Sequence, residues 1–222
     1  RLESVKKIFK DLGASDEDIK IEKFKDIQNL VVTRKGKTDD TVVIGAHYDK
    51  VSNGCGIIDN WTGIVIMANI YRSVASVSPQ KTFVFVAFDR EEEGLRGSAA
   101  MAKNIPKEER ARYCSMVNLD SFGMGYPLIL ENASSSSMVK YAKDMAAELK
   151  AQVNTLSLAG VADADSSSFK AKDIPAVTIS ALSAKWPEVL HSSNDKLENV
   201  LPASVRVGYL FSLQYLAKID AA

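Results

Sequence analysis

The sequence is poor in the residues and runs that mark several common protein classes. Its two cysteines, Cys55 and Cys114, are too few for a disulfide framework and lack the paired spacing of a zinc–thiolate site. The two cysteines could still form one disulfide bridge, so their number does not decide between an oxidising and a reducing compartment. No apolar run approaches the roughly 20 residues of a membrane-spanning helix, and we expect no membrane span.

Charge of one sign is not in excess either. The 28 basic and 28 acidic residues balance, and neither sign gathers into a long block. The chain therefore lacks the electrostatic footprint of a protein that binds nucleic acid or an anionic membrane. A small molecule or a peptide is the expected partner, and the sequence carries no signal for the oligomeric state.

Length and apolar content predict one domain over residues 1–222, since 46% of the residues are hydrophobic. The first ten residues, RLESVKKIFK, have the pattern of an amphipathic helix rather than of a signal peptide. Because the sequence starts at Arg1, we expect a targeting segment to be missing from it. A secreted or periplasmic location is the expectation.

Strand patterns alternate with helix patterns along the chain. Strands are predicted at 30–34, 41–46, 82–88, 115–120, 127–130 and 174–180, and helices at 2–12, 62–76, 98–104, 135–150 and 203–219. Several strand runs are continuously apolar, as in strands that are covered on both faces. The pattern predicts an α/β three-layer sandwich, in which a mixed, mostly parallel sheet lies between helical layers.

Histidine is also scarce, and both histidines stand beside carboxylates. His47 lies in GAHYD and His191 in EVLHSSND. Acidic residues follow apolar runs at three further places: Asp59 in IIDN, Glu91 and Glu92 in FDREEEGLRGS, and Asp120 in VNLDSFG. In open α/β sheets, ligands bind beyond the carboxyl ends of the strands, so this pattern indicates a metal-dependent hydrolase.

Imidazole nitrogen and carboxylate oxygen are ligands that zinc accepts. Five candidates could hold two zinc ions if one carboxylate bridges them: His47, Asp59, Glu92, Asp120 and His191. Three ligand carboxylates and a hydroxide would offset the charge of both ions, which makes burial tolerable.

The neighbouring Glu91 and Glu92 could divide two tasks, because successive side chains at a strand end point in different directions. One would bind metal while the other takes a proton from the attacking water. Asp49 is placed to accept the second N–H of the His47 imidazole.

The order HYD, IDN, EEEGLRGS, NLD and HSSND resembles the co-catalytic zinc aminopeptidases of metallopeptidase family 28, over roughly residues 42–199. The resemblance implies the zinc exopeptidase fold, two zinc ions, and peptide substrates with a free N-terminus. It implies His47 and Asp120 on one ion, Glu92 and His191 on the other, Asp59 between them, Glu91 as the general base and Glu93 as a spacer.

Two positions depart from the family pattern. Ser166 stands where histidine is frequent, and Val161 stands near a position where some members carry a tyrosine that stabilises the oxyanion. Valine cannot donate that hydrogen bond, so the oxyanion donor stays open. Asp163 and Asp165 could line the pocket or form an ordinary turn.

Other interpretations stay open at this stage. Residues 91–93 could be a solvated charge run at the start of a helix, and Asp59 and Asp120 could cap helices. The same pattern also resembles that of glutaminyl cyclases, which share the fold and most of the ligands but use one zinc ion and transfer an amine instead of water. A carboxypeptidase, or a non-catalytic binding domain of the same fold, are further alternatives.

Overall fold

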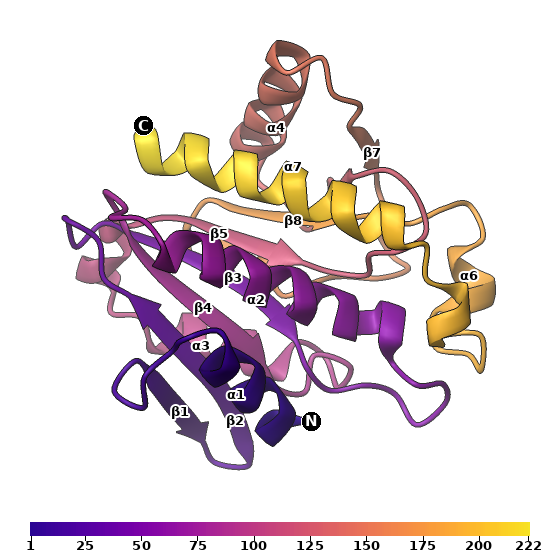
Figure 1. Ribbon diagram of the computed structural model, residues 1–222, viewed down its shortest axis with the longest axis horizontal. Coiled ribbons are helices and arrows are strands. Elements are labelled where there is room, and N and C mark those ends of the chain that lie inside the picture. Colours follow the sequence, from indigo (N-terminus) through magenta and orange to yellow (C-terminus); the bar gives the residue numbers. More distant parts are fainter.

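A mixed sheet of eight strands forms the middle layer of the protein in the computed structural model, which describes residues 1–222 (Figure 1). The order across the sheet is β1-β2-β4-β3-β5-β8-β6-β7. The strands are β1 (Ile19–Phe24), β2 (Ile27–Arg34), β3 (Thr41–His47), β4 (Thr82–Phe88), β5 (Tyr113–Leu119), β6 (Leu128–Leu130), β7 (Asn154–Leu156) and β8 (Ala176–Ser180).

The four central strands, β4, β3, β5 and β8, run parallel to one another, and antiparallel pairs join β1 to β2, β2 to β4 and β6 to β8. His47 at the end of β3 pairs with Phe88 at the end of β4, and Leu119 at the end of β5 pairs with Ile179 of β8. The segments that follow β3, β4 and β5 therefore leave the sheet on the same side, at the carboxyl ends of the parallel strands.

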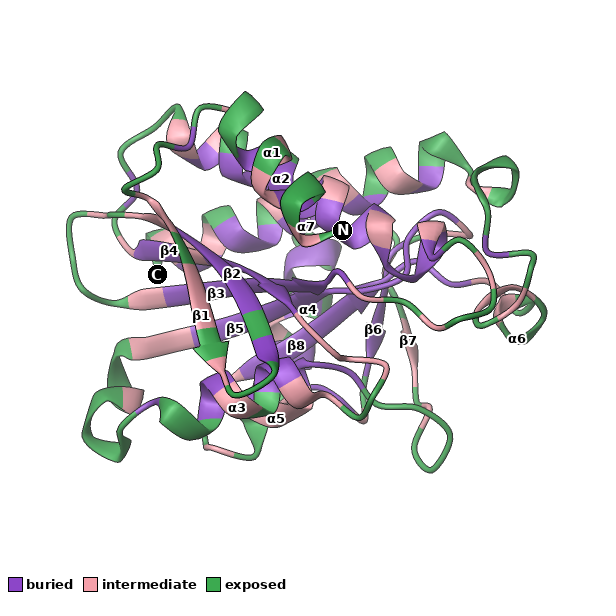
Figure 2. Cartoon of the chain, turned by 90° about the horizontal axis from the view of Figure 1, so that it is seen from below, coloured by how far each residue is buried: buried purple, intermediate pink, exposed green.

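Helices cover both faces of the sheet. They are α1 (Leu2–Asp11), α2 (Thr62–Ala75), α3 (Arg96–Asn104), α4 (Ser136–Glu148), α5 (Ser166–Lys170), α6 (Trp186–Val189) and α7 (Pro202–Ala221). A π-helical turn, η1 (Ile57–Trp61), precedes α2, and two short 3-10 turns are η2 (Lys107–Arg112) and η3 (Leu197–Asn199). The helices α1, α2 and α7 lie on one face, while α3 and α5 lie on the other (Figure 2). None of the helices combines the length and the apolar character needed to cross a membrane.

The alternation of side chains along each strand divides the core between the two faces. Val42 and Ile44 belong to the larger hydrophobic cluster, which α1, α2, α4 and α7 complete, whereas Val43 belongs to the smaller cluster under α3 and α5. Burial on both faces explains why these strands read as continuous apolar runs. The predicted three-layer sandwich with a mixed central sheet is confirmed.

Candidate functional site

The structure brings all seven predicted site residues to the edge where the parallel strands end. They are His47 at the end of β3, Asp49 just after it, Asp59 in η1, Glu91 and Glu92 between β4 and α3, Asp120 after β5, and His191 after α6. The parallel arrangement of β3, β4 and β5 brings the segments after these strands together, and the loop after α6 adds His191, which faces Asp59 and Glu92.

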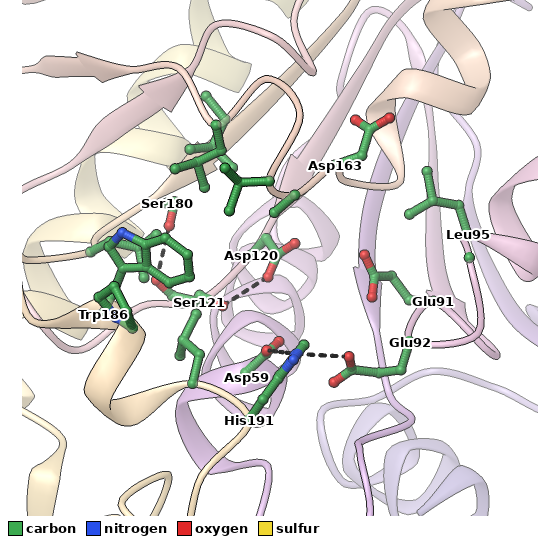
Figure 3. A pocket seen from close by; sticks show the side chains of 18 residues that line it. Asp59, Glu91, Glu92, Leu95, Asp120, Ser121, Asp163, Ser180, Trp186 and His191 are labelled. Atoms are coloured by element: carbon green, nitrogen blue, oxygen red, sulfur yellow. Dashed lines mark hydrogen bonds and ion pairs between the residues drawn. The ribbon is translucent and has the colours of Figure 1, made fainter.

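Asp59 lies between the two histidines, with one carboxylate oxygen toward each. Its Oδ1 is 3.0 Å from Nε2 of His47, and its Oδ2 is 3.1 Å from Nε2 of His191. The same His191 nitrogen is 2.9 Å from Oε2 of Glu92, and Nε2 of His47 is 3.8 Å from Oδ1 of Asp120. Figure 3 shows His191 between Asp59 and Glu92. This arrangement gives Asp59 the position of a bridging ligand.

The Asn60 side chain connects the turn that carries Asp59 to the end of β5. Its Nδ2 donates to the carbonyl of Leu119 at 2.8 Å, and its Oδ1 accepts from the amides of Gly63 and Ser121 at 3.0 and 3.1 Å. A Cβ at Gly63 would stand 2.4 Å from the Leu119 carbonyl oxygen, so only glycine allows this approach. Asp59 and Asp120 are thereby held beside each other.

The two glutamates lie in a loop and not at a strand end, which corrects the argument from strand alternation. The β4 strand ends at Phe88, and Arg90 has a left-handed φ of 55°. The carboxylate of Asp49 fixes this loop, because it accepts the amides of Glu91 and Glu92 at 3.1 and 3.2 Å. The conformation of the loop sets the direction in which each of the two carboxylates points. Alternation along a strand does not explain it.

Asp49 also faces the imidazole of His47, with its Oδ1 3.3 Å from Nδ1. The other ring nitrogen, Nε2, faces the acidic cluster. A carboxylate beside Nδ1 favours the tautomer that leaves Nε2 free to bind a metal. The predicted orienting role of Asp49 fits this geometry, and Asp49 in addition holds the glutamate loop.

Non-glycine residues with a left-handed backbone gather in the loops of the site. Of seven such residues in the chain, four lie in these loops: Arg90, Leu95, Ser121 and His191. Each such conformation costs on the order of 1 kcal/mol and persists where surrounding contacts impose it. The concentration of these conformations at one edge is typical of a functional site.

Proton affinities in the cluster are displaced from their ordinary values. Burial raises the pKa of Glu91 well above its usual range and raises that of Glu92 to about 7, with the charge of Asp59 adding to the second shift. The hydrogen bond to Asp59 raises the pKa of His191 to about 9. Burial opposes the charged form of His47, but the surrounding carboxylates outweigh it and its pKa is raised. Such crowding of carboxylates calls for a cation.

Two overlapping groups have ligand atoms within 4.8 Å of one another and could each hold a metal ion: His47 with Asp59 and Glu92, and His47 with Glu91 and Asp120. Oε1 of Glu92 is buried and has no hydrogen-bond partner. A buried carboxylate oxygen without a donor is costly unless a cation satisfies it. The donor set, imidazole nitrogen and carboxylate oxygen, suits zinc.

A cavity of about 400 Å³ opens directly on this cluster (Figure 3). One side of it is acidic, where Asp59, Glu91, Glu92 and Asp120 face the cavity. The lining also has an apolar part, which includes Leu130, Leu158, Val161, Leu182, Trp186 and Leu190. The cavity can therefore place an apolar side chain beside the acidic cluster.

Two further acidic residues lie close to the site and were not assigned a role from the sequence. Asp165, at the start of α5, is fully buried, neither of its carboxylate oxygens has a hydrogen-bond partner, and burial raises its pKa to about 7. Asp195, four residues after His191, is buried and accepts backbone amides of η1. Asp195 could have been found from the sequence, because it belongs to the HSSND motif that contains His191. Nothing in the local sequence distinguished the buried Asp165 from Asp163, which lines the cavity.

The departures from the family pattern have local explanations. The hydroxyl of Ser166 donates to the carbonyl of Ala133 at 2.7 Å and lies 2.6 Å from the hydroxyl of Thr178, so this side chain ties α5 to β8. Val161 is 72% exposed at the rim of the cavity. Cys55 and Cys114 are unbridged.

Comparison with protein families decides the relationship of the chain. The model of peptidase family M28 matches residues 29–213. The chain belongs to this family. Its similarity to the aminopeptidase YwaD of Bacillus subtilis is 34% identity over 102 residues, which covers 45% of this chain and 22% of that protein. The chain thus spans only about a fifth of the length of this M28 relative.

Two solved structures share the fold. A zinc aminopeptidase from Bacillus subtilis superimposes with a TM-score of 0.76 at 23% identity, over 86% of this chain and 49% of that chain. A glutaminyl cyclase from an Acidobacteriales bacterium gives a TM-score of 0.82 at 16% identity, over 98% of this chain and 84% of that one. At these identities the likeness concerns the fold alone, so the M28 chain shares its architecture with proteins of two different activities.

Proposed function

We propose that this M28 chain is the catalytic domain of a zinc-dependent aminopeptidase, which removes the N-terminal residue from peptides. The observation that carries the proposal is the position of Asp59, whose two carboxylate oxygens each face a different histidine. A carboxylate placed in this way could be shared by a pair of adjacent metal ions. The zinc named for the relative in Bacillus subtilis supports the choice of metal.

Each residue has a distinct part in this proposal. His47 and Asp120 would hold one zinc ion, Glu92 and His191 the other, and Asp59 both. Three ligand carboxylates would offset three of the four positive charges of two zinc ions, so the filled site can be buried. When bound, zinc polarises the scissile carbonyl group and makes water more acidic.

Glu91 is the proposed general base. It lies in the cavity wall beside the metal-ligand candidates (Figure 3). Its position beside the metal-ligand candidates would let its carboxylate take a proton from the attacking water. The water oxygen forms a bond to the carbonyl carbon, the C–N bond then breaks, and Glu91 returns the proton to the leaving amine.

A glutaminyl cyclase activity is the second candidate. It is favoured by one observation, that the fold match covers 84% of the cyclase chain but only 49% of the zinc aminopeptidase chain. The sequence match favours the peptidase, because the relative that shares 34% identity is named an aminopeptidase. The two activities differ in whether water or the substrate's own amine attacks the carbonyl.

A panel of short peptides separates these activities. Zinc-loaded protein is incubated with peptides that have a free or an acetylated N-terminus, including peptides that start with glutamine, and products are followed by mass spectrometry. We expect release of the first residue from the free forms only. Cyclisation of N-terminal glutamine without hydrolysis would establish the cyclase instead, and no turnover across the panel would contradict both.

Asp49 offers a test of the metal site that does not need a substrate. Replacing Asp49 with asparagine is expected to weaken zinc affinity by roughly 10- to 100-fold, since partners that orient a metal ligand typically contribute this much. A competition titration with a chromogenic chelator measures the change. Asp39→Asn, an exposed position before β3, is the control, and equal affinities in the two variants would contradict the orienting role.

A further inference from the structure

The turn that presents Asp59 is held from one side by Arg1. The guanidinium of Arg1 donates to the carbonyl oxygens of Cys55 at 2.8 Å and Gly56 at 2.6 Å, and to those of Tyr48 and Asp49 at 3.0 and 2.9 Å. Four carbonyls from both ends of one loop converge on one cation. Only a planar guanidinium presents enough donors in a fixed fork to bind all four.

The fit around Arg1 is close. A Cβ at Gly56 would lie 2.7 Å from a guanidinium nitrogen, so the cation occupies the space that a side chain would fill. Gly56 also has a left-handed φ of 63°, which glycine adopts without strain. The indole of Trp61 lies under the cation, 5.3 Å from ring centre to guanidinium carbon, within the range of a cation–π interaction.

The same turn is held from the other side by Asp195. Its Oδ1 accepts the amides of Ile57 at 2.9 Å and Ile58 at 2.6 Å, and its Oδ2 accepts the amide of Asp59 at 3.4 Å. Its backbone carbonyl accepts the amide of Cys55 at 2.9 Å. Asp195 is 3% exposed, so water cannot replace these bonds.

The charges of Arg1 and Asp195 are therefore opposite in sign to the backbone groups that they bind along residues 55–59. The cation takes carbonyl oxygens in the first part of the turn, and the anion takes amide hydrogens in the second part. Charge-assisted hydrogen bonds of this kind are about twice as strong as neutral ones. Since Asp195 follows His191 by four residues, one short segment sets the position of His191 and the backbone of Asp59 together.

We propose that Arg1 and Asp195 form a positioning clamp, which holds Asp59 between His47 and His191 and thereby sets the zinc affinity of the site. The zinc part of this inference rests on the proposed function. Neither residue touches the reacting atoms. Both act through the backbone of the turn, Arg1 from the position before α1 and Asp195 from the loop after α6.

The test compares zinc affinity in Asp195→Ala and in a matched control. Asp220 has the same chemistry far from the site, because its carboxylate accepts the amides of Gln80 and Lys81 at 3.1 and 2.7 Å. We expect Asp195→Ala to weaken zinc affinity by roughly 10- to 100-fold, measured by chelator competition, and Asp220→Ala to leave it within about twofold while lowering stability. Equal affinities in the two variants would overturn the clamp.

Two further variants keep the test informative if Asp195→Ala does not fold. Asp195→Asn retains one acceptor oxygen and is expected to show a smaller loss of zinc affinity than alanine. Arg1→Ala is expected to weaken zinc binding in the same direction, and the double variant Arg1→Ala, Asp195→Ala is expected to lose less than the sum of the two effects, because both residues hold one turn. Full additivity would show that they act separately.

Amide hydrogen exchange tests the clamp without zinc. The amides of Ile57, Ile58 and Asp59 are expected to exchange slowly in the unaltered protein and faster in Asp195→Ala, while those of Gln80 and Lys81 stay unchanged. Unchanged exchange at 57–59 would overturn the clamp whatever the metal does. If the unaltered protein bound no zinc but showed the exchange pattern, the proposed function would fail and the clamp of the turn would stand.

Discussion

Replacing Glu91 with glutamine is expected to lower kcat by roughly 100- to 10,000-fold, because this is the range that a positioned general base contributes. Glutamine has nearly the shape of glutamate but no basic carboxylate. The five proposed metal ligands are unchanged, so zinc content should stay the same. The measurement pairs turnover of a peptide with a free N-terminus with zinc content by atomic absorption.

Glu93 provides the matched control for this prediction. It stands two residues after Glu91 in the same loop, but its carboxylate points to the surface and pairs with Arg90 and Arg96 at 2.9 and 2.7 Å. Exposed pairs of this kind contribute little to stability, so Glu93→Gln should keep nearly full activity. A near-normal rate in Glu91→Gln would refute the general base, and an equal loss in both variants would point to the loop instead.

The sequence predicted the sheet well where strands are long and buried on both faces. The apolar runs that became β3, β4 and β5 begin within two residues of their predicted starts. Two strands had no such signal: β1 reads IKIEKF and is an edge strand with exposed lysines, and β7 has three residues. Their pairing is decided by neighbours in space, which local periodicity cannot show.

The candidate site was predictable because scarce residue types mark it. Two histidines with carboxylates nearby, several of them just after strands, identified the chemistry, and parallel pairing explains why the residues that follow β3, β4 and β5 meet. The orientation of Glu91 and Glu92 was not predictable, because the loop backbone and its bonds to Asp49 decide it. The clamp residue Asp195 was visible in HSSND, but its partners lie about 137 residues away in the chain.

Removing the metal is expected to lower thermal stability, and the loss is expected to grow as the pH rises from about 5 to 9. In the absence of zinc, protons take its place. The pKa of Glu92 is raised to about 7, so its contribution to folding is full below its ordinary value of 4.5 and is lost as the pH rises through 7. The pKa of His191 is raised to about 9, so its contribution is full below its ordinary 6.5 and is lost as the pH rises through 9.

Both shifts have the same sign, and zinc binding strengthens over the same interval because the ligands must be deprotonated. The pKa of Asp59 is lowered, which affects stability only at more acidic pH.

At free zinc about 100 times Kd, zinc binding raises the free energy of unfolding by about 2.7 kcal/mol, which corresponds to a Tm difference of roughly 5–10 °C for a domain of this size. Calorimetry with zinc or chelator at several pH values measures it. Asp59→Ala should abolish the zinc-dependent part, because it removes the carboxylate that faces both histidines, and a difference that shrank with rising pH would contradict the proposed ligands.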